Sequence, residues 1–185
     1  MYRIIAVVAV LLCSAAGPAY AQIDLFLLGK LSGAVAAGDL RQAELALKQG
    51  EDANLVESNG KSMLTTAATA GNADMVALLL RYGADPNRKD TLGNTALSYA
   101  AATGEADAIR TLIDGRANPN LGNNQGATPL MMAAQQGRLE SVQVLLDKGA
   151  NPKLTDYTGR TALAWARQNG KDAVAKILIA RGAPE

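Results

Sequence analysis

The chain has 185 residues, with 18 Lys and Arg against 17 Asp and Glu, one Cys and no His. A chain with almost no net charge lacks the concentrated positive field that attracts nucleic acids and anionic membranes. The sequence therefore predicts neither partner. Without imidazoles and with one thiol, it also lacks the usual ligands of transition metals and the usual general base. We therefore expect no metal and no cofactor.

Residues 1–21 have the layout of a cleaved secretory signal peptide. Arg3 precedes an apolar run from Ile4 to about Gly17, and small residues stand at Ala19 and Ala21. The run is shorter than the ~20 residues of a membrane-spanning helix, although an uncleaved anchor is an alternative. We expect cleavage after Ala21 and a mature chain of residues 22–185, either in the periplasm of a Gram-negative bacterium or secreted.

Cys13 lies inside the apolar run, after Leu12 rather than after the small residue of a lipoprotein signal, so we expect it to leave with the signal. Residues 22–185 then contain neither Cys nor His. Loss of Arg3 leaves 17 basic and 17 acidic side chains. An exported domain without disulfides must be held together by its core, and a chain of this length can bury roughly two-thirds of its unfolded surface.

A period of 33 residues divides the mature chain. One set of glycines falls at 60, 93, 126 and 159, and a second set at 71, 104, 137 and 170. Such a period is typical of a repeat protein, in which each repeat is one supersecondary unit. We expect five units: a capping unit 1 at residues 24–56, units 2 to 4 at 57–89, 90–122 and 123–155, and a C-terminal unit 5 at 156–185.

Unit 4 shows how each unit folds. Thr128 is a good N-cap and Pro129 suits the first helical position, so a short alanine-rich helix begins there and ends at Gly137. A second helix begins at Leu139, carries Val142, Leu145 and Leu146 on one face, and ends before Gly149.

The other units repeat this apolar stripe. Each helix pair exposes an apolar side that only a neighbouring pair can cover, so stacking predicts an elongated solenoid with one continuous core. The corresponding stripes hold Val76, Leu79 and Leu80 in unit 2, Ile109, Leu112 and Ile113 in unit 3, and Val174, Ile177, Leu178 and Ile179 in unit 5.

Gly-Ala-Thr-Pro-Leu at residues 126–130, the following alanines, the closing glycine, the paired leucines and Gly-Ala-Asn-Pro at 149–152 closely resemble the ankyrin repeat. The resemblance covers about residues 24–185. It implies an all-α ankyrin-repeat solenoid of antiparallel helix pairs with β-hairpin turns, about five repeats including two caps. It also implies a concave face, formed by hairpins and first helices, that usually binds a protein.

This chain departs from the family pattern at the position after Thr-Pro-Leu, where a histidine normally bonds between neighbouring turns. Thr65, Ser98, Met131 and Ala164 occupy it, which predicts less rigid turns. The end units are also atypical. Unit 1 predicts helices over residues 24–37 and 40–48, and unit 5 has charged residues where a terminal surface needs polarity.

Unit 3 breaks the helix-ending pattern. Gly83, Gly149 and Gly182 end the second helices of other units, whereas unit 3 has Arg116, with Gly115 one place early. A residue other than glycine in a left-handed conformation costs about 1–2 kcal/mol. We therefore predict either backbone strain at Arg116 or a shifted helix end.

Catalytic motifs are not supported. Gly60-Lys61-Ser62 ends like a phosphate-binding loop, but Leu55 stands where that loop needs glycine. Residues 85–90 offer oxygen ligands, yet proline and two cations interrupt the spacing of a calcium loop. Paired carboxylates could hydrolyse glycosides, but nothing places two acids across a cleft.

Tyr99, Met132 and Trp165 share one column of the repeat and could stack on a cofactor. Because the column directly precedes the alanines of the first helix, core packing is the better interpretation. Met131 and Met132 do not suggest a metal site, since consecutive helical residues face different directions.

Binding residues are expected where the repeat leaves positions free, at hairpin tips and at the ends of first helices. This set is rich in amides and nearly neutral, which suits a polar protein surface or peptide, with Leu92, Tyr157 and Arg160 as anchors. The predicted contacts are Lys61, Lys89, Leu92, Asn94, Asn124, Gln125, Gln135, Gln136, Tyr157, Arg160, Gln168 and Asn169.

The sequence thus predicts a monomeric, non-enzymatic protein–protein interaction module of the cell envelope, without membrane contact once the signal is removed. It would sequester, inhibit or scaffold another protein. A stress-protective or immunity-type factor that neutralises an enzyme or toxin is the alternative. A polar solenoid surface with no specific partner is the simplest competing interpretation.

Overall fold

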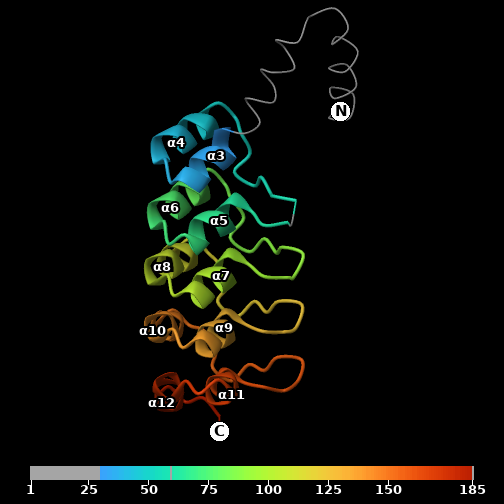
Figure 1. Ribbon diagram of the computed structural model, residues 1–185, viewed down its shortest axis with the longest axis vertical. Helices are drawn as coiled ribbons and strands as arrows, with labels where there is room; N and C mark the ends of the chain where they lie inside the picture. The colour runs from blue at the N-terminus through green and yellow to red at the C-terminus, as the bar shows by residue number, and fades with distance from the viewer. Residues whose placement is uncertain (1–29, 59, 185) are drawn as a thin grey trace, which may run out of the picture.

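The computed structural model describes residues 30–58 and 60–184. Within them the chain forms five antiparallel helix pairs stacked along one axis (Figure 1), and the only bridges between extended residues are two isolated ones. The all-α solenoid expected from the sequence is confirmed. The helices are α3 (Lys30–Ala37), α4 (Leu40–Lys48), α5 (Met63–Thr69), α6 (Ala73–Arg81), α7 (Ala96–Thr103), α8 (Ala106–Asp114), α9 (Pro129–Gln136), α10 (Leu139–Asp147), α11 (Ala162–Gln168) and α12 (Asp172–Ala180).

Side-chain caps fix where the first helix of each unit begins. In α9, Thr128 Oγ1 accepts the Met131 amide N–H, Pro129 takes the first position, and Gly137 closes the helix with a left-handed φ of 74°. The same hydroxyl cap is made by Ser62, Thr95 and Thr161. A single 33-residue pattern therefore sets four helix starts.

Alanines let neighbouring units approach closely. On the first helices, residues such as Ala67, Ala100 and Ala133 are almost completely buried, and Val76, Ile109 and Val142 of the second helices are fully buried. The apolar stripes expected from the sequence thus form one continuous core. The exception is Ile179, which stays 42% exposed because no described unit follows it.

Asparagines connect the loops that follow successive second helices. The Asn54 side chain donates to the Gly83 carbonyl and accepts the Asp85 N–H, and Asn87 repeats this with Arg116 and Asn118. Asn120 makes the same pair of bonds to the next loop. Each asparagine therefore joins its unit to the following one, and Lys153 takes this position in unit 4.

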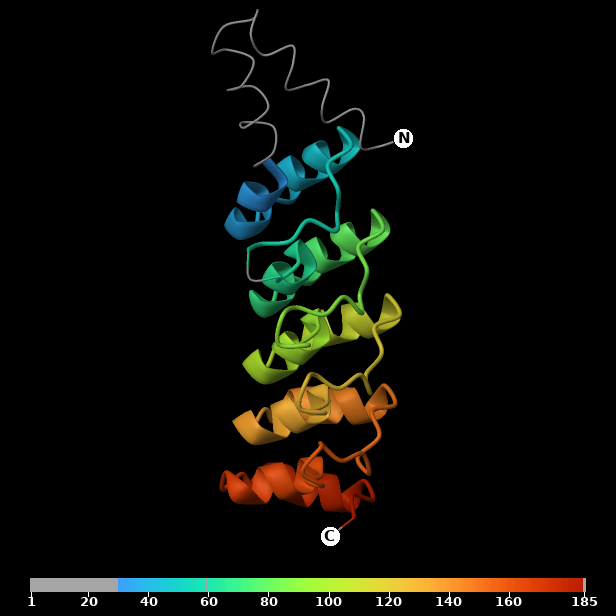
Figure 2. The ribbon, with the colours of Figure 1, turned by 90° about the vertical axis from the view of Figure 1, so that its right-hand side faces the viewer.

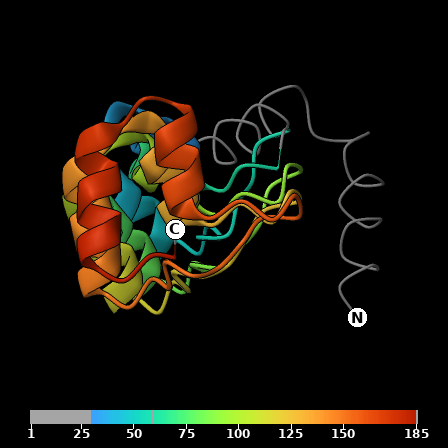
Figure 3. The same cartoon turned by 90° about the horizontal axis from the view of Figure 1, so that it is seen from below.

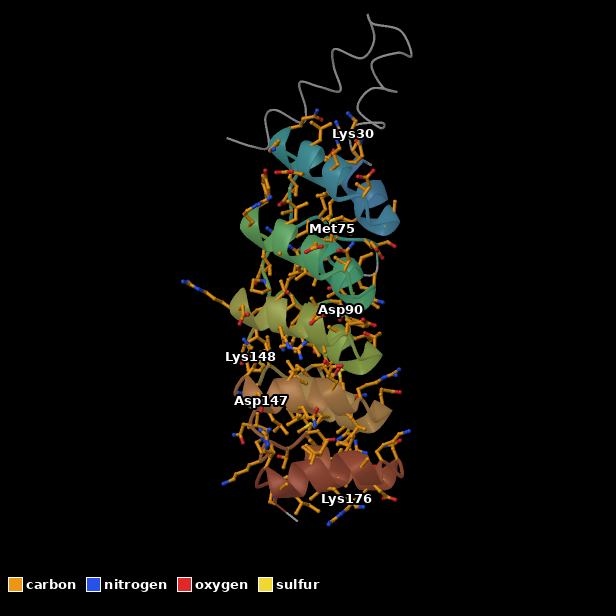
Figure 4. The ribbon with its side chains drawn as sticks, turned by 90° about the vertical axis from the view of Figure 1, so that its left-hand side faces the viewer. Lys30, Met75, Asp90, Asp147, Lys148 and Lys176 are labelled. Carbon is orange, nitrogen blue, oxygen red and sulfur yellow. The ribbon has the colours of Figure 1, made fainter. Side chains whose placement is uncertain are left out.

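The second helices form an outer face that carries ion pairs between units (Figure 4). Arg110 reaches Glu140 at 3.2 Å and Lys148 reaches Asp114 at 2.6 Å. Asp147, at the end of α10, pairs with Arg181 at 2.8 Å. Because these groups are exposed, solvent screens them, and the pairs contribute far less than the apolar core.

Arg116 adopts the left-handed conformation with φ 70°, alone among non-glycine residues of the described chain. The strain predicted from the sequence is therefore present, and the helix end has not shifted. Gly115 packs closely on the preceding unit, since a Cβ there would lie 2.6 Å from Leu80 Cδ1 and the Leu80 side chain would have to shift. Arg116, and not Gly115, adopts the left-handed conformation at the end of α8.

Two expectations fall outside the described residues: the signal peptide at 1–21 and the part of the first predicted helix that precedes Lys30. The second predicted helix of unit 1, residues 40–48, is confirmed as α4. In the described part of the chain, no helix combines the length and the apolar character that crossing a membrane requires.

Candidate functional site

Four hairpins project from the helices toward the same side of the stack (Figures 2 and 3). All four contain a backbone bond with the same spacing in the chain. The N–H groups of Glu57, Asp90, Asn123 and Asp156 donate to the carbonyl four residues later at 2.8, 2.9, 3.0 and 3.0 Å. We call the hairpins together with α5, α7, α9 and α11 the hairpin face.

An acidic or amide side chain at the first position of each hairpin braces the turn. Asp90 Oδ1 accepts the N–H groups of Leu92 and Asn94, and Asp90 Oδ2 accepts the Tyr99 hydroxyl at 2.6 Å. In unit 2 the same contact joins Thr66 Oγ1 to Glu57. The hairpin is thereby tied to its own first helix.

Asp156 makes the most extensive of these networks. Its carboxylate accepts N–H and O–H bonds from Thr158, the backbone N–H of Arg160 and the Trp165 indole, and it pairs with the Arg160 guanidinium at 2.9 Å. Burial alone would raise the pKa of Asp156, but these hydrogen bonds hold its pKa well below the ordinary value. The carboxylate is therefore charged, buried and fully bonded.

These braces were missed by the sequence interpretation, although a signal was present. Positions 57, 90, 123 and 156 carry Glu, Asp, Asn and Asp, and the positions nine residues later carry Thr, Tyr, Met and Trp. The family's histidine column was expected to supply turn contacts, and its loss suggested looser turns. This chain instead braces three of its hairpins through that second pair of columns.

The aromatic column packs inward, as the sequence favoured. Trp165 is 9% exposed, and the guanidinium carbon of Arg160 lies 4.3 Å from its ring centre. Lys61 Nζ lies 4.4 Å from the ring centre of Tyr99. Burial, and then the hydrogen bond to Asp90, raise the pKa of Tyr99. Both cations are thus held over rings.

Neighbouring hairpins are joined to one another. The Asn124 N–H donates to the Leu92 carbonyl at 3.2 Å, and the Tyr157 N–H donates to the Gln125 carbonyl at 3.0 Å. Asn123 Nδ2 donates to Asn94 Oδ1 at 2.9 Å. These bonds place the tips of units 3, 4 and 5 side by side.

Asn94 needs correction as a predicted contact residue. It is 7% exposed, and its amide oxygen already accepts the hydrogen bond from Asn123. The position faces the next hairpin rather than solvent. Asn94 therefore holds two hairpins together and offers little surface to a partner.

Six more of the predicted residues have side chains engaged within the protein. Lys89 Nζ donates to the Gly122 carbonyl at 2.7 Å, and Arg160 donates to Gln168 Oε1 at 3.3 Å. Lys61 lies over Tyr99, while Asn124 and Asn169 donate to the carbonyls of Thr91 and Trp165. The other five predicted residues have no side-chain hydrogen bond, ion pair or ring contact within the described residues: Leu92, Gln125, Gln135, Gln136 and Tyr157.

Two open hollows lie on opposite faces. One, of about 300 Å³, is lined by Glu57, Lys61, Thr66, Thr69 and Ala70 on the hairpin face. The other, of about 610 Å³, lies between α4 and α6 on the outer face and is lined by Leu40, Arg41, Glu44, Asp74, Ala77, Leu78 and Arg81. Neither encloses its contents, so both suit a surface partner better than a small molecule.

Within residues 30–58 and 60–184, no three Asp, Glu, Cys or His side chains come together as a metal site would require. A family model described as ankyrin repeats (3 copies) matches residues 31–123 and 115–184, which together span most of the chain. No curated protein matches the sequence.

Proposed function

The chain belongs to the ankyrin-repeat family, and on that premise we propose that it is a non-enzymatic binding module of the cell envelope, which sequesters, inhibits or scaffolds another protein through its hairpin face. Ankyrin repeats are generally protein–protein interaction modules. The placement in the envelope rests on residues 1–21, whose charge and apolar pattern is that of a secretory signal.

The observation that carries the binding proposal is a pair of large apolar side chains fixed at the hairpin tips. Leu92 is 62% exposed and Tyr157 is 79% exposed, while backbone bonds hold their hairpins in place. Side chains on a rigid support lose little entropy on binding, and tyrosine is among the residues enriched where most of the energy of a protein interface lies.

A capture experiment tests the binding proposal. Residues 22–185 are immobilised and exposed to a bacterial envelope extract, beside a variant carrying Leu92→Ala and Tyr157→Ala. A matched control carries Leu139→Ala and Gln143→Ala, which change an exposed leucine and an exposed glutamine of α10. Mass spectrometry should find a protein retained by the parent and the control and lost from the hairpin variant.

Equal retention by all three proteins would place the interface elsewhere and contradict the proposal. The identity of a retained protein separates the possible roles: an enzyme or toxin indicates an inhibitor or immunity-type factor, and an assembly component indicates a scaffold.

Export is tested separately. The full chain is produced in a Gram-negative host, cells are fractionated by osmotic shock, and the N-terminus of the product is sequenced. We expect a periplasmic product that begins at Gln22. A cytoplasmic product that retains Met1 would contradict the envelope proposal and leave the binding surface intact.

A further inference from the structure

The side chains left unengaged on the hairpin face gather in one part of the stack. Of the predicted contacts, Leu92 belongs to unit 3, Gln125, Gln135 and Gln136 to unit 4, and Tyr157 to unit 5. We call these five residues the amide patch. The equivalent helix-end positions of unit 2, Thr69 and Ala70, line a hollow together with the charged residues Glu57 and Lys61 instead.

Unit 4 lacks two internal contacts that unit 5 makes, and one of these contacts engages a glutamine. In unit 5, Arg160 crosses from the hairpin to Gln168 on α11. The residue equivalent to Arg160 is Ala127 in unit 4, which cannot reach Gln135, the equivalent of Gln168. Likewise Met132 stands where Trp165 stands and donates no hydrogen bond to its hairpin.

The ends of the amide patch are held in position. The Asn124 N–H donates to the Leu92 carbonyl and the Tyr157 N–H donates to the Gln125 carbonyl, so three hairpin tips are joined in a row. The ring of Tyr157 also packs on Gly126, where a Cβ would lie 2.8 Å from the ring and 3.0 Å from the Tyr157 nitrogen. Two apolar anchors therefore flank a glutamine at fixed positions.

The ionisable groups beside the amide patch are already engaged within the protein. Asp156 and Arg160 pair with each other, and Asp90 accepts the hydroxyl of Tyr99, over whose ring Lys61 lies. Lys89 and Arg138 donate to the carbonyls of Gly122 and Ala102. A charged partner would have to replace these internal bonds to gain an opposite charge, which costs affinity. A neutral partner meets no such cost.

From these observations we infer that the amide patch binds an extended, uncharged segment of the partner protein, with the backbone of that segment bonded to Gln125, Gln135 and Gln136. A primary amide offers both a donor and an acceptor, as a peptide backbone does, and one or two apolar side chains of the segment would contact Leu92 and Tyr157. This inference rests on the proposed function and adds the chemistry of the partner.

Three pools of ten-residue synthetic peptides test it, each containing Leu and Tyr among neutral, acidic or basic residues. Binding to residues 22–185 is measured at 50 and 500 mM NaCl. We expect the neutral pool to bind most tightly, with a Kd that changes less than about twofold with salt, because no charge pair is formed.

Matched variants locate the site. Gln135→Ala with Gln136→Ala should weaken the neutral pool about tenfold, the sum of two hydrogen bonds of roughly 0.7 kcal/mol each. Tyr157→Ala should weaken it as well. Gln143→Ala changes an exposed glutamine on the outer side of the same unit and should leave the Kd unchanged.

Tighter binding of a charged pool, a tenfold loss of affinity at high salt, no binding by any pool, or equal losses in the Gln143 variant would overturn the inference. None of these results decides the capture experiment, which reports whether the hairpin face retains a protein at all. Failure of the inference and failure of the proposed function are therefore distinguishable.

Discussion

The hairpins of units 4 and 5 have the same backbone but different side-chain supports. Asn123 and Asp156 each donate their N–H across the turn at 3.0 Å, and Gly126 and Gly159 have left-handed φ values of 77° and 82°. In unit 5 the Asp156 carboxylate binds the first helix of its own unit. In unit 4 the Asn123 amide instead binds sideways to Asn94 of the preceding hairpin.

This difference separates two tasks of the repeat. Backbone hydrogen bonds and glycines shape every hairpin in the same way, so the hairpins of different units have the same backbone conformation. Side chains decide whether a unit engages its polar groups internally. In unit 5, Asp156 binds Trp165 and Arg160 binds Gln168, whereas Ala127 of unit 4 cannot reach Gln135. Unit 5 bonds these polar groups internally, whereas unit 4 leaves its glutamines available to a partner.

The largest expected effect separates the two hairpin glycines. Gly126→Ala should lower the free energy of unfolding by about 3 kcal/mol, since it combines the left-handed penalty with a Cβ pressed against Tyr157. Gly159 has no atom within 4 Å of its added Cβ, so Gly159→Ala should cost only about 1–2 kcal/mol. Urea unfolding of both variants measures the difference, and equal losses would show that Tyr157 does not press on Gly126.

Removing the side chain at the first position of the hairpin should destabilise unit 5 more than unit 4. Asp156→Ala leaves the Trp165 indole and Arg160 without their acceptor and should cost about 2–3 kcal/mol, since hydrogen bonds to a charged group are the stronger ones. Asn123→Ala breaks only neutral bonds and should cost about 1 kcal/mol. Chemical denaturation of both variants is the measurement, and the reverse order would contradict the comparison.

Acid should act on unit 5 through Asp156. Its folded pKa lies below the ordinary ~3.9, so its stabilisation is complete above that value and is lost as the pH falls toward the folded pKa. Asp156→Asn makes unit 5 resemble unit 4 and removes this titration. Between pH 5 and pH 2 the urea midpoint of the parent should therefore fall more than that of the variant, and parallel profiles would refute this.

A smaller effect comes from the second helix of unit 4. Ser141 is fully buried and its hydroxyl has no hydrogen-bond partner among the described residues, whereas unit 5 has the buried Val174 at the equivalent position. Ser141→Ala should raise the free energy of unfolding by about 1 kcal/mol. Ser62→Ala, which removes a bonded N-cap hydroxyl, is the matched control and should lower it by a similar amount. A loss of stability in the Ser141 variant would show that its hydroxyl is satisfied.

The smallest effect extends the comparison to unit 3. Units 4 and 5 end their second helices with left-handed glycines, Gly149 and Gly182, whereas unit 3 uses Arg116. Arg116→Gly should stabilise the protein by roughly 0.5–1 kcal/mol, because relief of strain outweighs the added freedom of the unfolded chain. An unchanged or lower urea midpoint would show that the strain is offset by other contacts.

Much of the fold was predictable from the sequence because its signals are local and repeated. Thr128, Pro129 and Gly137 set the limits of α9 through caps that involve only nearby residues, and α4 spans the predicted residues 40–48. The strained Arg116 could also be predicted, since comparison with neighbouring units showed a glycine out of place.

The candidate site was less predictable because its decisive contacts join residues of different hairpins or of a hairpin and a helix. Asn94 was expected to face a partner, yet it is buried and accepts a hydrogen bond from Asn123, which lies 29 residues further along the chain. Arg160 was expected to be an anchor, yet Asp156 and Trp165 hold it. The type of a residue and its place in the chain indicate a polar residue in a loop, but not what bonds to it.

By itself the sequence determined the repeat, the helix pairs, the alanine faces and the apolar core, because each follows from periodicity and from preferences of one residue type. Only the tertiary structure decided which polar side chains remain on the surface, because hydrogen bonds are directional and short. The same asparagine or arginine is a contact residue or a brace according to what lies within about 3 Å of it.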